Sequence, residues 1–278
     1  MKLKSLFFIL YLSLVCISQG VVNIVLDYGD TSQEDIDAHG ASFMAAERFW
    51  ESRLTGYIDQ GDNAPDQVTI SVSLENIDGL FGTLGSAAPT RGNFGGNFVE
   101  TTEGEMRFDT SDIPLYGGLI PGSFEDVIRH EMGHVLGFGS LWTNNGVYQN
   151  GTGQYTGAAG LAAFREEFNA PDAAFVPVEL QGGPGTADGH WDEGTNYASI
   201  HTGQRLDDEL MSGGASGDMW LSDTTLQSFR DIGYTVIPEP AASALFLALI
   251  GLACTIRRRI RSTRGCRFPG VSAGSTNR

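Results

Sequence analysis

The stretch SFEDVIRHEMGHVLGF, residues 123–138, is the most informative part of this 278-residue chain. Ser123, followed three residues later by Asp126, forms a capping box, a pattern that marks the start of a helix. Apolar side chains then recur at helical spacing along one face: Ile128, Met132 and Val135. The pattern predicts a helix over residues 123–137 with that face in the core.

The same stretch places two histidines four residues apart, away from the apolar face. His130 and His134 are separated by about 40° around the helix axis, so both imidazoles can bind one metal ion. Glu131 lies next to the pair and is too short to ligate the same metal, but it can contact a metal-bound water. Zinc lowers the pKa of such a water, and a carboxylate can take its proton as it attacks a carbonyl. The HExxH pattern therefore predicts zinc-dependent hydrolysis.

Two histidines do not complete a zinc site, and the sequence offers several third ligands. A compact motif would place this ligand at Ser140, whose side chain cannot serve. A glutamate from the following helix could bind instead, and Glu166 and Glu167 are available there. A distant histidine is the other alternative, either His190 or His201.

Two later segments follow HEMGHVLGF in a characteristic order: GGPGTADGHW at residues 182–191 and ELMSG at residues 209–213. Together with YTGAA at residues 155–159, this order resembles the leishmanolysin-like zinc metallopeptidases, a metzincin family. The resemblance implies a zinc metalloendopeptidase in which Glu131 is the general base. It also implies roles for five further residues: His130, His134 and His190 bind zinc, Gly137 turns the chain, and Met211 lies beneath the metal.

Spacing and local sequence favour different third ligands within this resemblance. His201 lies ten residues before Met211, near the usual family spacing, whereas His190 has the family's glycine-rich approach and following tryptophan. A ten-residue loop insertion costs about a kilocalorie or less in closure entropy, while the orientation of a ligand depends on its immediate neighbours. We therefore expect His190 to bind the metal and His201 to be solvent-exposed in a loop over residues 193–207.

The resemblance implies an α+β fold of the metzincin type, in which a twisted mixed sheet and the active-site helix lie over an irregular C-terminal subdomain. Hydrophobic periodicity predicts the other elements. Strands are expected at residues 21–27, 68–74 and, at a sheet edge, 104–110; helices are expected at 41–57, 158–168 and 223–232. Residues 79–96 should form a loop with at most one short strand, and residues 182–217 should be mostly irregular.

The two ends of the chain differ in composition from its centre. Residues 1–20 contain two lysines, an apolar run and then small residues, the layout of a secretory signal peptide. Residues 238–261 run from Pro-Glu-Pro through an apolar stretch to an arginine cluster, and resemble the PEP-CTERM sorting signal. That resemblance implies a transient anchor in the inner membrane, cleavage by an exosortase-type partner, and delivery to the cell surface or matrix. A permanent transmembrane helix is the alternative, and a short tail, residues 262–278, follows.

Residues 21–237 form the predicted metallopeptidase domain. They contain 33 acidic residues, eight arginines and no lysine, which gives a formal charge of −25. The whole chain has a net charge of −17, which argues against nucleic-acid binding, since such binding relies on Lys and Arg. The acidity of residues 21–237 is compatible with bound Ca²⁺, although no EF-hand spacing is present. A protein or peptide substrate is expected. The alternative function is a surface or matrix adhesion module without turnover, which the intact Glu131 disfavours.

Overall fold

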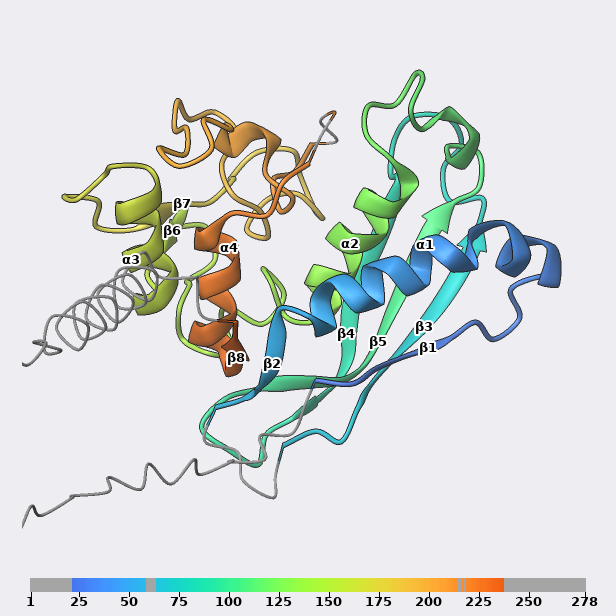
Figure 1. Ribbon diagram of the computed structural model, residues 1–278, viewed down its shortest axis with the longest axis horizontal. Coiled ribbons are helices and arrows are strands. Elements are labelled where there is room, and N and C mark those ends of the chain that lie inside the picture. The colour runs from blue at the N-terminus through green and yellow to red at the C-terminus, as the bar shows by residue number, and fades with distance from the viewer. Residues whose placement is uncertain (1–21, 59–63, 215–216, 218, 238–278) are drawn as a thin grey trace, which may run out of the picture. The chain divides into compact units, whose positions relative to one another are not determined.

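The computed structural model describes residues 22–58, 64–214, 217 and 219–237, all within a compact unit that ends at Ile237 (Figure 1). The predicted signal peptide, sorting signal and C-terminal tail lie outside the described residues. Among the described residues, no helix combines the length and the apolar character that a membrane crossing requires.

A four-stranded mixed sheet forms the N-terminal part of this unit, so the predicted α+β class with a mixed sheet is confirmed. Strands β1 (Ile24–Asp27) and β5 (Glu100–Asp109) pair in parallel with the two sides of β3 (Val68–Glu75). Strand β4 (Gly85–Asn93) pairs antiparallel with β5, which gives the order β1-β3-β5-β4. In β3 the predicted alternation places Val68, Ile70 and Val72 in the core.

Most of residues 104–110 belong to strand β5, as predicted, but the expectation that this strand lies at a sheet edge is wrong. Strand β5 lies inside the sheet because residues 85–93, predicted as part of a loop, form a nine-residue strand outside it. The sequence of β4, GSAAPTRGN, contains few residues that favour strands. Its pairing with β5 holds it in place, and Pro89 with the register shifts around Arg91 is typical of an edge strand.

The helix expected over residues 41–57 has different limits. Helix α1 (Gln33–Glu51) begins eight residues earlier, where the Ser32 side chain accepts a hydrogen bond from the backbone N–H of Asp35 at 3.1 Å. Strand β2 (Leu54–Tyr57) follows and pairs antiparallel with β8 (Tyr234–Val236) near the other end of the chain. Leu54 and Tyr57 continue the helical spacing by coincidence, and long-range pairing with β8 overrides it.

Helices α1 and α2 (Phe124–Val135) lie across one face of the sheet (Figure 1). Phe43 of α1 contacts the rings of Phe108 in β5 and Phe124 in α2, with centroids 5.5 and 5.9 Å away. The indole N–H of Trp50 donates to the carbonyl of Arg129 at 2.9 Å. These contacts join both helices and the sheet in one core.

The C-terminal part is mostly irregular, as predicted. Its short elements are β6 (Gln154–Tyr155) paired with β7 (Val176–Pro177), α3 (Ala158–Glu167), and three 3-10 or α-helical turns: η3 (Leu206–Asp208), α4 (Asp223–Ser228) and η4 (Phe229–Ile232). An additional 3-10 turn, η2 (Ile113–Leu115), precedes α2. Buried aromatic rings hold this region together; for example, Trp191 stacks on Trp142 with centroids 5.0 Å apart.

Candidate metal centre

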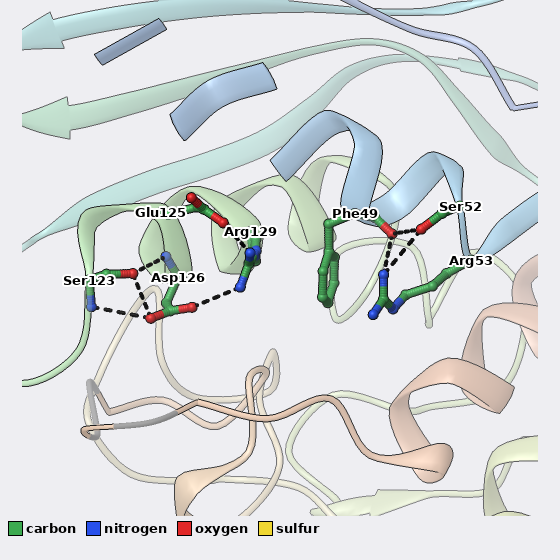
Figure 2. Close-up of polar contacts among 7 residues, drawn as sticks. All are labelled: Phe49, Ser52, Arg53, Ser123, Glu125, Asp126 and Arg129. Atoms are coloured by element: carbon green, nitrogen blue, oxygen red, sulfur yellow. Dashed lines mark hydrogen bonds and ion pairs between the residues drawn. The ribbon is translucent and has the colours of Figure 1, made fainter. Parts of the chain in front are cut away.

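Helix α2 begins at the predicted capping box. The Ser123 hydroxyl accepts from the Asp126 backbone N–H, and the Asp126 carboxylate accepts from that of Ser123, both at 3.2 Å (Figure 2). Arg129, one turn later, pairs with Glu125 and Asp126 and lies over the Phe49 ring, its Cζ 4.7 Å from the centroid. The face predicted for the core is fully buried: Ile128, Met132 and Val135 are all 0% exposed. These contacts fix the start and the orientation of the helix.

The structure brings His130, His134 and His190 together. Their three Nε2 atoms lie 2.9–3.0 Å from one another. Each Nδ1 faces a backbone carbonyl: that of Leu210 at 2.6 Å for His130, that of Phe138 at 2.9 Å for His134, and that of Thr186 at 2.8 Å for His190. Among the described residues, no other group of three or more His, Cys, Asp or Glu side chains brings its ligand atoms this close.

This hydrogen bonding fixes which nitrogen of each ring carries the proton. A carbonyl can only accept, so each Nδ1 carries a hydrogen and, in a neutral ring, each Nε2 is left with a lone pair. Burial lowers the pKa of all three imidazoles, to about 3 for His130, which favours the neutral rings. The three lone pairs converge on one point, so these residues could hold a metal ion, and three imidazole nitrogens are a donor set that suits zinc.

Glu131 lies on the same helix and is 6% exposed. Burial raises the pKa of its carboxyl group to about 8. The start of β4 passes directly beside this carboxylate, because a Cβ added to Gly85 would lie 2.9 Å from Oε1 of Glu131. No sequence pattern indicated Gly85, since only strand β4, which was not predicted, brings it to the site.

The loop that carries His190 is held by a close backbone approach and by a partly buried clasp of hydrogen bonds. A Cβ on Gly139 would lie 2.4 Å from the carbonyl oxygen of Gly189, so only glycine permits this crossing. Asp188 adopts a φ of 66°, and its Oδ1 accepts from the Tyr148 hydroxyl and, at 2.7 Å, from the Gly151 N–H. The Asp188–Tyr148 clasp thus orders the backbone two residues before His190.

The segment around Met211 lies under helix α2, and Met211 is 0% exposed. A Cβ on Gly133 would lie 2.8 Å from its sulfur, which explains the glycine inside the HEMGH sequence. The buried carboxylate of Glu209 accepts from the backbone N–H groups of Met211 at 2.6 Å and Ser222 at 2.9 Å. Glu209 belongs to the ELMSG segment, but its supporting role depends on Ser222, which sequence spacing does not reveal.

The alternative ligands lie elsewhere. His201 is exposed, as expected, and so is Glu166. The buried Glu167 accepts from the N–H of Thr224 at 3.0 Å and from its hydroxyl at 2.9 Å, so it holds the start of α4. Gly137 turns the chain after α2 with a φ of 115°.

Two histidines on one helix, a distant histidine and a buried glutamate meet at this site in an α+β chain. This arrangement is typical of metallopeptidases. Comparison with known families matches residues 104–257, more than half of the chain, to the leishmanolysin family. The chain therefore belongs to the leishmanolysin family of zinc-dependent metallopeptidases.

A leishmanolysin homolog from Crithidia fasciculata is 33% identical to this chain over 121 residues. The comparison covers 38% of this chain and 16% of that relative. The chain thus spans a small part of the relative's length.

Proposed function

We propose that this protein is a zinc-dependent metalloendopeptidase of the metzincin type, with His130, His134 and His190 as zinc ligands and Glu131 as general base. The observation that carries the proposal is the convergence of three Nε2 lone pairs beside a buried carboxylate on the same helix. Membership of the leishmanolysin family supports the same reaction class. Met211 and Gly137 then have the structural roles that the resemblance implies.

The chain's own residues supply the proton transfer. Zinc, when bound, would polarise the scissile carbonyl and acidify the attacking water. Glu131 accepts the proton from that water and delivers it to the leaving amine. This proton transfer needs a carboxylate that is basic near neutral pH. The carbonyls of Leu210, Phe138 and Thr186 keep the three Nε2 atoms unprotonated and aimed at one point.

Strand β4 offers a place for the substrate backbone. It is an edge strand of the sheet, and its first residue, Gly85, lies beside Glu131. An extended peptide can add to such an edge by main-chain hydrogen bonds. We propose that residues 85–88, which precede the irregular register at Pro89, hold the substrate next to the base.

The test is zinc-dependent hydrolysis of an unstructured protein such as casein by the full-length protein. We expect hydrolysis that a chelator abolishes and that added Zn²⁺ restores. A protein that binds about one zinc per chain without any turnover would instead support the adhesion module, and one that binds no zinc would contradict both functions.

We further propose that residues 1–20 direct export and that residues 238–261 act as a sorting signal cleaved by an exosortase-type enzyme. The support is the composition of both segments. Mass spectrometry of surface-localised protein should find a C-terminus near Pro238. Retention of residues 241–261 in that protein would favour a permanent anchor.

A further inference from the structure

The loop between β3 and β4 exposes two large apolar side chains. Leu80 is 61% and Phe81 is 59% exposed. Phe81 also has a φ of 58°, in the left-handed region that bulky residues rarely adopt. The loop therefore maintains a strained backbone at a point where it presents an aromatic ring to the solvent.

Three aspartates hold the loop in this shape. Oδ2 of the buried Asp109 accepts from the backbone N–H groups of Ile77, Asp78 and Gly79 at 2.8–3.0 Å. Oδ1 of Asp112, also buried, accepts from the N–H of Phe81 at 2.9 Å. The Asp78 carboxylate accepts from the N–H of Thr83 at 3.1 Å. Because the loop is already ordered, binding a ligand on it costs little further conformational entropy.

The loop leads directly to the strand beside the catalytic carboxylate. Phe81 is four residues before Gly85, whose added Cβ would lie 2.9 Å from Oε1 of Glu131. Four residues of chain reach at most about 14 Å, which is also the length of about four residues of an extended peptide. Leu80 and Phe81 are thus within reach of a peptide whose scissile bond lies at Glu131.

We propose that Leu80 and Phe81 form a subsite that binds one apolar side chain of the peptide substrate, about four residues from the scissile bond. The inference rests on the proposed peptidase function. Its occupant is a substrate side chain and not an anionic lipid surface, because the formal charge of −25 on residues 21–237 opposes binding to such a surface. Covering both side chains removes apolar area from water, which favours the complex.

The experiment compares a set of peptides that share the same residues around the scissile bond. Each peptide carries either leucine or serine at one further position, and this position is moved along the peptide on both sides of the bond. We expect the zinc-loaded full-length protein to prefer leucine by about tenfold in kcat/KM at one position about four residues away. The variant Leu80→Ser/Phe81→Asn should lose that preference and cleave short peptides that lack the position as fast as the wild type. Asparagine tolerates the left-handed backbone better than phenylalanine, so the thermal midpoint should not fall.

Phe94→Asn is the matched control, since Phe94 is 71% exposed just beyond the other end of β4. It should leave the preference unchanged. If the wild type cleaves the peptides without preferring leucine, or if the double variant keeps the leucine preference, the subsite proposal is overturned and the peptidase function is not. A wild type that cleaves none of the peptides would overturn the peptidase function and the subsite with it.

Discussion

The two regions that form the site hold their residues by different physical means. The sheet region, residues 22–138, positions His130, Glu131 and His134 on one helix, whose backbone ladder and buried face fix all three together. The loop region, residues 139–237, positions His190 and Met211 through individual hydrogen bonds to the carboxylates of Asp188 and Glu209 and through close glycine approaches. A single change should therefore displace one group in the loop region, while groups on the helix keep their spacing.

The largest expected effect is that of Glu131→Gln in the sheet region. This change should impair proton transfer and leave metal binding intact. Glu131→Gln preserves the size of the side chain and the helix, so it should keep about one zinc per chain. It removes the proton acceptor, and kcat/KM should fall by about 10²- to 10⁴-fold. Zinc content and peptide hydrolysis measured on the same preparation check this expectation.

Glu125→Gln is the control on the same helix, because Glu125 pairs with Arg129 at the surface. A partly exposed pair on the helix surface contributes about 1 kcal/mol or less, and Glu125 does not reach the metal site, so activity should stay near that of the wild type. Full peptidase activity in Glu131→Gln would disprove the role of Glu131 as base.

The second prediction concerns His190, the single zinc ligand that the loop region is proposed to contribute. His190→Ala removes one of three converging Nε2 atoms, so zinc affinity should fall by several kcal/mol. His201→Ala removes an exposed side chain and should leave affinity and activity nearly unchanged. Zinc competition titrations of both variants measure the difference. The reverse result would make His201 the ligand, and loss in neither variant would exclude both histidines.

The contrast between the regions also sets what the sequence could predict. Helix α2 was predicted to within two residues, because its cap, its apolar face and its metal-binding pattern are all local signals. Local sequence favours His190 over His201 as the third ligand; in the structure His190 lies beside the pair, while its role as a ligand stays a prediction. Local patterns succeed where one segment contains the whole determinant.

Features that depend on distant partners were missed. Strand β4 has little intrinsic preference for a strand, and its pairing with β5 decides its conformation. Strand β2 continues the apolar spacing of α1 and is separated from it only by pairing with β8, about 180 residues away. Gly85 and the Asp188–Tyr148 clasp reach the site for the same reason, so no local pattern could indicate them.

The third prediction weakens a contact of the loop region without removing a ligand. Asp188→Ala breaks the clasp with Tyr148 and Gly151 and places alanine at a φ of 66°. Zinc affinity should fall by about 10- to 100-fold, the range for residues that orient a ligand. Asp188→Asn tolerates the backbone and keeps an acceptor, so it should restore most of that affinity. Equal affinity in the alanine variant and the wild type would show that the clasp does not orient His190.

The smallest expected effect concerns Asp109, a carboxylate of the sheet region. It holds the loop after β3 by accepting backbone hydrogen bonds, as Glu209 holds the Met211 segment in the loop region. The backbone N–H groups of Asp78, Ser111 and Gly79 hold the pKa of Asp109 at about 2, below its usual range. A folded-state pKa below the unfolded one contributes stability that is present above the unfolded pKa, near 4, and is lost as the pH falls towards 2.

The wild-type thermal midpoint should therefore drop between about pH 4 and pH 2. Asp109→Asn cannot ionise and should be less stable at pH 7 but show a smaller drop between about pH 4 and 2. Asp27→Asn, an exposed change elsewhere in the sheet, should keep the wild-type profile. An identical acid profile in Asp109→Asn would mean that other carboxylates control this transition and that Asp109 holds its loop only through geometry.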